Sequence, residues 1–198
     1  PSMPRNYSRL LSTSDGRRMA YQRIELAEKL SDPDHIARFA PGTVGAAYRA
    51  FLEKTGYSAD GLAKVSNLNQ EPIVEDAYMW FGRRTRDVHD IWHVLTGYRA
   101  DESLGEAALV AFSYAQTGGK GWAFIAIAAS LKSWRVTRNL AFARAVLEGY
   151  RLGRRASWLL GEDYEKLLNE PFDAARARLG IAEAVRYQAC NPVQEWSA

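Results

Sequence analysis

Residues 86 to 110 read RDVHDIWHVLTGYRADESLGEAALV and contain two of the chain's three histidines. Apolar residues recur every three or four positions on both sides of a break at 97–101, which is the period of a helix that buries one face. Ser103 and Glu106 stand at the two ends of a capping-box pattern, so they predict where the second helix starts. That helix also carries small residues that allow close approach of another helix: Ala107, Ala108, Ala111 and Ala115.

Helical patterns extend in both directions from this stretch, and no segment shows the alternation of a strand. We expect Gly56 and Gly180 to cap helices and Pro171 to begin one. The run 121–131 is apolar nearly all round, which is typical of a helix buried on most sides. The expected helices cover 20–30, 34–40, 41–57, 58–67, 76–95 (with an interruption considered at Gly82), 103–116, 121–131, 133–160, 162–169 and 171–179. The sequence therefore predicts one all-α domain, a helical bundle over residues 1–198, with loosely ordered tails at 1–19 and 190–198.

Length and composition fit a single globular domain. The 198 residues are 47% hydrophobic and 25% charged, as in ordinary globular proteins. The single cysteine, Cys190, excludes a disulfide framework and a cysteine-based zinc finger. The longest uncharged apolar run, 122–131, is about half of the roughly 20 residues that span a bilayer. No secretory signal precedes it, although the Arg- and Ser-rich segment 5–18 leaves a transit peptide open, so we expect a soluble or membrane-peripheral chain.

The basic residues are unevenly distributed along the sequence, although the net charge is only +3. Six arginines lie in or just before one predicted amphipathic stretch: Arg135, Arg138, Arg144, Arg151, Arg154 and Arg155. Such a face suits an anionic membrane surface or a phosphate, and it equally suits plain solvation. No nucleic-acid-binding signature accompanies the charge, so we expect no nucleic acid partner.

His89 and His93 are four residues apart, so they project from one side of a helix about one turn apart. Two imidazoles at this spacing can hold one divalent metal ion. Asp90 flanks the same face, and Glu106 would meet the histidines if the next helix folds back antiparallel. Such a ligand set suits a catalytic zinc site or a non-haem iron site, so the spacing leaves the metal open. An amphipathic helix with two histidines and no metal is the alternative.

A phosphohydrolase of the His-Asp type is a second interpretation of the same residues. Those enzymes also need a more distant histidine and aspartate to hold two metals. His35 is the only upstream histidine, and nothing marks a downstream aspartate. The glycine-rich TGGKG at 117–121 lacks the spacing of a phosphate-binding loop, so it predicts a turn between helices.

Together these motifs resemble one known family, the coenzyme Q (ubiquinone) biosynthesis proteins of the Coq-four type. The resemblance covers about residues 41–181 and is carried by PGTVGAAYRAFL (41–52), RTRDVHDIWHVLTGY (84–98), LGE (104–106), YAQTGG (114–119), GYRLGRRASWLL (149–160) and YEKLLNEPFDAARARLGI (164–181). It implies that the family's metal-binding positions are occupied here by His89, Asp90, His93 and Glu106, with zinc as the favoured metal and iron as the alternative.

The spacing of the fourth ligand departs from the family pattern. Twelve residues separate His93 from Glu106, one more than in the family. The extra residue fits in the loop GYRADE at 97–102, where insertion costs little. Glu102 is the alternative fourth ligand.

The resemblance implies a function in ubiquinone biosynthesis. The implied substrate is a polyprenylated quinone precursor derived from 4-hydroxybenzoate, and the implied reaction is removal of its C1 carboxylate, either oxidative and coupled to C1 hydroxylation or not. The catalytic residues would be the four metal ligands. The alternative role is a non-catalytic prenyl-lipid-binding scaffold that organises the other biosynthetic proteins around a structural metal.

The resemblance also implies where the protein acts and with which partners. It predicts a homodimer that binds a membrane peripherally and associates with other ubiquinone-biosynthesis proteins. The expected location in the cell is the cytoplasmic face of a membrane in a bacterium, or the mitochondrial inner membrane in a eukaryote.

Substrate contacts can be proposed for both ends of such a molecule. A prenyl tail needs an apolar groove, because each buried CH₂ contributes about 0.8 kcal/mol. The candidate wall is the helix at 121–131, with Trp122, Phe124, Ile125 and Ile127, and plain core is the alternative.

Three arginines just before the metal motif are the candidates for binding the substrate carboxylate: Arg83, Arg84 and Arg86. Of these, Arg83 has the alternative of pairing with Asp87 one helical turn later.

Overall fold

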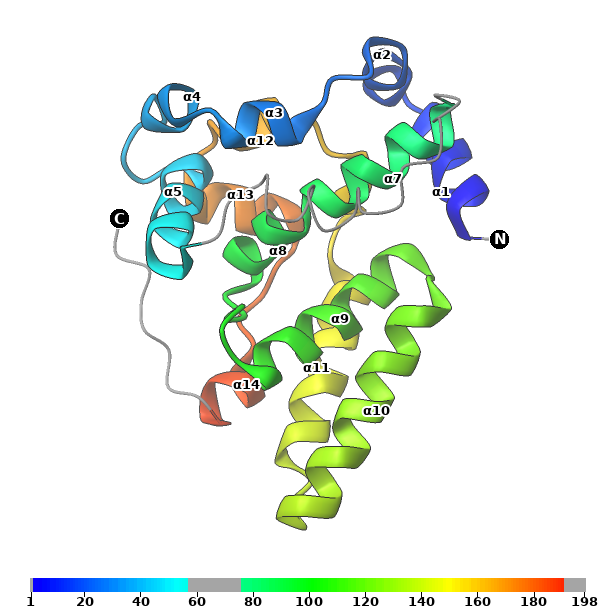
Figure 1. Cartoon of the computed structure of the whole chain (residues 1–198), viewed down its shortest axis with the longest axis vertical. Coiled ribbons are helices and arrows are strands. Elements are labelled where there is room, and N and C mark those ends of the chain that lie inside the picture. Colours follow the sequence, from blue (N-terminus) through cyan, green and yellow to red (C-terminus); the bar gives the residue numbers. More distant parts are fainter. Residues whose placement is uncertain (1, 57–75, 191–198) are drawn as a thin grey trace.

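The computed structural model describes residues 2–56 and 76–190, which form a set of helices joined by turns (Figure 1). In chain order these are α1 (Ser2–Leu11), α2 (Ser14–Gln22), α3 (Leu26–Ser31), α4 (Pro33–Ala37), α5 (Val44–Thr55), α7 (Ala77–Asp87), α8 (His89–Thr96), α9 (Ser103–Thr117), α10 (Lys120–Thr137), α11 (Ala141–Arg155), the 3₁₀ turn η1 (Leu159–Gly161), α12 (Tyr164–Leu167), α13 (Phe172–Leu179) and α14 (Val185–Cys190). The described residues form no β-sheet, and Thr43 and Pro171 make one isolated bridge. The all-α prediction is confirmed.

Helix α9 is the centre of the fold, with α8 against it on one side and α10 and α11 against it on another. Its aromatic Phe112 is fully buried and meets Trp92 of α8 edge to face, with ring centroids 6.0 Å apart. Trp92 Nε1 donates to the hydroxyl of Tyr164 at 2.6 Å, and that hydroxyl donates to the carbonyl of Leu159 at 3.0 Å. This buried chain of hydrogen bonds ties α8 to α12 and η1, so the helix that carries the histidines has a fixed orientation.

Two glycines of α11 explain how closely it packs on α9. A Cβ placed on Gly149 would lie 2.5 Å from the carbonyl oxygen of Ala108, and one on Gly153 would lie 2.6 Å from that of Phe112. Those distances are shorter than non-bonded carbon and oxygen atoms can adopt, so only glycine permits this approach. The small-residue face of α9, which includes Ala115, thus meets α11.

Several helix ends lie where the sequence predicts them. Gly56 follows α5 with φ 66°, and its N–H donates to the carbonyl of Leu52. Gly180 follows α13 with φ 67°, and Pro171 directly precedes that helix. The helix predicted at 58–67 lies outside the described residues.

Other boundaries differ from the prediction. The helix expected at 76–95 is interrupted at Val88 and not at Gly82, which lies inside α7. The long helix expected at 133–160 is divided in two. Helix α10 ends at Thr137, because Arg138 adopts a left-handed conformation with φ 53°. Asn139 then accepts a hydrogen bond from the N–H of Ala141. The side chain of Asn139 therefore restarts the chain as α11.

The N-terminal region also differs from the prediction. The loose tail expected at 1–19 instead contains α1 and most of α2, and Leu10 of α1 is fully buried. The helix expected at 20–30 is divided at Arg23, which has φ 46° and separates α2 from α3. The apolar period alone did not reveal these short helices.

The capping box expected at the start of α9 is absent. Glu102 is the N-cap residue, without a side-chain cap, and Ser103 is the first helical residue. The Glu102 carboxylate instead accepts a hydrogen bond from the hydroxyl of Tyr187 in α14.

Helix α10 is exposed on most sides, so the expectation of a buried helix at 121–131 is wrong. Phe124 is 74% exposed and Ile127 is 60% exposed, whereas Ala126 is buried. The physical reason is visible in Figure 1, where α10 and α11 form a hairpin that projects from the rest of the fold. In the described part of the chain, none of the helices is long and apolar enough to cross a bilayer.

Candidate metal centre

Three side chains from α8 and α9 converge as the sequence suggested. Among the described residues, the group that could hold a metal comprises His89, His93 and Glu106, whose ligand atoms lie within 4.8 Å of one another. His93 Nε2 is 3.3 Å from a carboxylate oxygen of Glu106. The two imidazole centroids are 4.9 Å apart with a 79° angle between the rings. The antiparallel return of α9 therefore brings Glu106 to the histidine pair.

The hydrogen bonding of His93 leaves one nitrogen available for a ligand. Its side chain is only 1% exposed, and Nδ1 lies 2.8 Å from the backbone carbonyl oxygen of Tyr98. Because a carbonyl can only accept, Nδ1 carries the proton and donates it. The buried Nε2 makes no hydrogen bond with any described residue. A protonated Nδ1 on a carbonyl and a bare Nε2 is the arrangement of a metal-binding histidine.

The set of donor atoms fits a divalent transition metal. Two imidazole nitrogens and one carboxylate oxygen suit zinc with an open coordination position, and they also suit non-haem iron. Two donors that are each about 2.1 Å from one ion are at most about 4.2 Å apart. The His93–Glu106 distance of 3.3 Å lies within that limit, and all three ligand atoms lie within 4.8 Å of one another, which is close to it. The residues present therefore fit the metal that the family implies.

The two acidic residues near this group have different positions. Asp90 is buried, and its Oδ1 lies 3.5 Å from Nδ1 of His89, so its carboxylate contacts the imidazole of one candidate ligand. Glu102 bonds Tyr187, whereas Glu106 faces the histidines. The geometry thus favours Glu106 over Glu102, and Asp90 as a direct ligand stays a prediction.

Aromatic rings surround the site. Phe51 of α5 stacks on His93 with centroids 6.0 Å apart, and Trp122 of α10 stacks on His89 at 6.3 Å. Burial, followed by the negative charges of Asp90 and Asp87, raises the pKa of Tyr48. Tyr48 is therefore a neutral phenol beside the buried carboxylates.

The arginines proposed for the substrate carboxylate are engaged elsewhere. Arg83 makes two hydrogen bonds to Glu25, at 2.6 and 3.2 Å. Arg86 pairs with Asp87 at 2.8 Å. The buried Arg84 donates to the backbone carbonyl of Glu162 at 2.7 Å. These partners explain the three arginines without a substrate.

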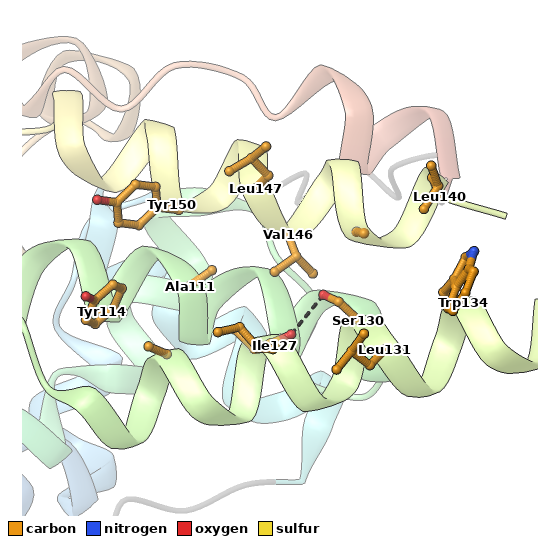
Figure 2. A pocket seen from close by; sticks show the side chains of 13 residues that line it. Ala111, Tyr114, Ile127, Ser130, Leu131, Trp134, Leu140, Val146, Leu147 and Tyr150 are labelled. Atoms are coloured by element: carbon orange, nitrogen blue, oxygen red, sulfur yellow. Dashed lines mark hydrogen bonds between the residues drawn. The ribbon is translucent and has the colours of Figure 1, made fainter.

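An apolar groove lies between α10 and α11, with α9 as its floor (Figure 2). Its volume is about 440 Å³, which is in the range of small-molecule sites. Of the four residues proposed as a wall, Ile127 lines the groove, whereas Trp122, Phe124 and Ile125 do not. Trp122 instead stacks on His89. The remaining lining includes Leu131, Trp134, Leu140, Val146, Leu147 and Tyr150. Apolar residues beyond position 131 were the signal that the sequence analysis missed.

Comparisons with known proteins identify the family. Residues 1–185 match the model of the family described as "Coenzyme Q (ubiquinone) biosynthesis protein Coq4". The mitochondrial ubiquinone biosynthesis protein coq4 of Pyrenophora tritici-repentis is 33% identical over 176 residues, which are 87% of this chain and 57% of that protein. The corresponding protein of Scheffersomyces stipitis is 25% identical over 183 residues, or 92% of this chain and 55% of that protein. The chain thus spans little more than half the length of these curated relatives.

A solved structure agrees at the level of the fold. It is a crystal structure described as that of a candidate ubiquinone biosynthesis protein from Nostoc punctiforme, with a TM-score of 0.62 and 21% identity over 92% of this chain and 82% of that one. On the family match and the identity to the curated relatives, this chain belongs to the coenzyme Q (ubiquinone) biosynthesis protein Coq4 family.

Proposed function

We propose that this chain is a metal-dependent ubiquinone-biosynthesis protein that removes the C1 carboxylate from a polyprenylated ring derived from 4-hydroxybenzoate. One observation carries the proposal: the buried Nε2 of His93 has no hydrogen-bond partner among the described residues and faces His89 and Glu106. A buried nitrogen in this state costs free energy unless a ligand binds it. Family membership supplies the substrate class.

The roles of the residues follow from their contacts. His89, His93 and Glu106 would hold the ion, with Asp90 as a further ligand or as the group that orients His89. When bound, a divalent metal acts as a Lewis acid that stabilises negative charge on the carboxylate and ring, and iron would also support oxidative chemistry. Phe51 stacks on the buried imidazole of His93, and Trp122 stacks on the imidazole of His89, whose side chain is 21% exposed. In the neutral ring of His93, the Tyr98 carbonyl accepts from Nδ1 and leaves Nε2 as the nitrogen that can bind the ion.

The groove between α10 and α11 suits the prenyl tail. Its lining is almost entirely apolar along its length (Figure 2). Helix α10 contributes to both places, because Trp122 contacts His89 and the next residue, Ala123, lines the groove. A ring near the histidines with its tail in the groove would therefore contact one helix throughout.

The test uses a polyprenylated 4-hydroxybenzoate-derived acid that is isotopically labelled at its C1 carboxyl carbon. We expect the metal-loaded protein to release the label as carbon dioxide. Glu106→Gln should lower the rate by about a hundredfold or more, since it removes an anionic ligand and the loss of a group that only orients a ligand already costs about 10–100-fold. The matched control is Glu102→Gln, which removes a carboxylate that bonds Tyr187 and should keep the rate within about twofold.

Equal losses in both variants would contradict the assignment of the fourth ligand. A metal-loaded wild type that binds the labelled acid but releases no label would overturn the enzyme and favour the alternative, a lipid-binding scaffold with a structural metal. Other ubiquinone-biosynthesis proteins are the proposed partners in either case.

The outer face of α10 is the proposed contact with a membrane. It presents large apolar side chains beside two cations: Phe124, Ile127, Leu131, Val136, Lys132 and Arg135. Exposed apolar surface next to basic residues is typical of helices that lie on anionic lipid. We therefore propose peripheral binding through this face.

Replacing Phe124 and Val136 by serine should weaken co-sedimentation with anionic vesicles by about tenfold or more, because each buried apolar side chain contributes about 1.5–3 kcal/mol. The control is Tyr21→Ser, which removes a side chain that is 90% exposed on α2. Equal vesicle binding by all three proteins would refute this surface. If the double variant instead alters only the sedimentation coefficient without vesicles, the face mediates the homodimer.

A further inference from the structure

A second hollow, of about 280 Å³, lies where α1, α9 and α11 meet, and it does not include the histidine site. The guanidinium-bearing residues Arg5 and Arg9 come from α1, and Arg154 comes from α11. The tyrosines Tyr114 and Tyr150 stack on each other with centroids 5.8 Å apart and line the same hollow. None of its described lining residues is acidic.

Among the residues that the structure describes, the three arginines of this hollow have no carboxylate partner. The ion pairs among the described residues involve other arginines: Arg18, Arg83, Arg86, Arg99 and Arg178. Arg5, Arg9 and Arg154 appear in none of these pairs. Like charges that converge without a counter-charge repel one another, and an anion bound between them removes that repulsion.

The hollow has a fixed polar floor. The buried Asn6 of α1 donates through Nδ2 to the carbonyl of Thr117 at 2.8 Å. The buried Gln116 donates to the carbonyl of Gly153 at 2.8 Å, and its Oε1 accepts from the N–H of Leu159 at 2.8 Å. These bonds hold α1, α9 and α11 together, so the arginines are displayed from elements of fixed relative position.

The arginines are not needed for capping α9. The N–H of Gly118 donates to the carbonyl of Tyr114 at 2.8 Å, and the side chain of Asn6 donates to the carbonyl of Thr117. Arg9 lies over the ring of Trp158 at 4.4 Å from its centroid, a contact that occupies the guanidinium face and leaves its N–H edge available. Available N–H edges are the groups that bind oxyanions in pairs.

We propose that this hollow is an anion site that binds a phosphate group. Arginine forks match phosphate oxygens in geometry, and three positive charges suit the charge of a phosphate monoester. The ligand can be a soluble phosphate ester or the headgroup of a lipid. Tyr114 and Tyr150 line this hollow and also one end of the apolar groove, so a phosphate on an apolar chain fits the continuous surface (Figure 2).

The experiment measures binding of inorganic phosphate by calorimetry, and of vesicles of neutral lipid with or without phosphatidic acid by co-sedimentation. The test variant is Arg5→Ala/Arg154→Ala. The matched control is Arg151→Ala/Arg155→Ala, which removes the same charge and takes both residues from α11, where neither lines the hollow. Thermal unfolding of each variant verifies folding.

We expect wild type and control to bind phosphate, phosphatidic acid vesicles or both, and the test variant to bind at least about tenfold more weakly. Binding of inorganic phosphate identifies a site for soluble esters, and binding confined to the vesicles identifies a lipid headgroup. Equal weakening in both double variants, or no binding by wild type to either probe, overturns the proposal. The result is independent of the metal centre, because His93→Ala should retain phosphate binding.

Discussion

Replacing His93 by alanine is expected to abolish stoichiometric metal binding and with it the proposed C1 decarboxylation. The side chain supplies a buried nitrogen, Nε2, that has no hydrogen bond with any described residue, and Tyr98 already fixes the orientation of the ring. Loss of a direct histidine ligand removes more than loss of an orienting group, which typically costs 10–100-fold. We therefore expect elemental analysis to show no retained zinc or iron, and the rate to fall by more than about a hundredfold.

The matched control is His35→Ala, the third histidine of the chain. His35 lies in α4 and meets Phe39 edge to face, and it is not part of the converging group. It should retain full metal content after refilling. Loss of metal in the His35 variant would instead support the phosphohydrolase interpretation, and two metals per chain would support it further.

Replacing Gly153 by leucine should be the most damaging change to the fold. Its Cβ would lie 2.6 Å from the backbone oxygen of Phe112 and 3.0 Å from the Cβ of Ala115, so α11 would have to move away from α9. Overpacking of this kind costs about 3 kcal/mol or more, out of about 5–15 kcal/mol for a typical domain. Urea unfolding should show a large fall in the free energy of unfolding, or no folded protein.

Gly82→Ala is the matched control, since Gly82 lies within α7 and a Cβ there would meet only Met3 Cε, at 3.6 Å. Alanine should raise the free energy of unfolding by about 0.5–1 kcal/mol through helix propensity. Similar stabilities for the Gly153 and Gly82 variants would mean that the close approach of α9 and α11 does not stabilise the fold.

The convergence of His89, His93 and Glu106 could be predicted from the sequence because the information that specifies it is local. The spacing of His89 and His93 places both on one helical face. The short connection between α8 and α9 favours an antiparallel arrangement, which brings Glu106 back to the histidines. The loop at 97–102, where we expect the extra residue, is the connection between α8 and α9, and the three side chains converge across it.

The contacts that the sequence did not reveal depend on distant partners. Arg83 pairs with Glu25, and no local pattern links these two positions. The burial of α10 was misjudged for another reason. A helix that is apolar all round is expected both in a core and on a surface that meets other apolar material, so the pattern cannot distinguish the two. The exposure of Phe124 and Ile127 shows that α10 does not lie in the core.

The glycine-mediated approach of α11 to α9 gives the groove one immovable side. Gly149 and Gly153 hold α11 against the backbone of α9. The width of the groove therefore depends on the opposite helix, α10. On that helix, α10, two of the lining residues are small, Ala123 and Ala126. The methyl groups of Ala123 and Ala126 therefore help to set the width of the groove, and valine at either position would narrow it without changing the histidines.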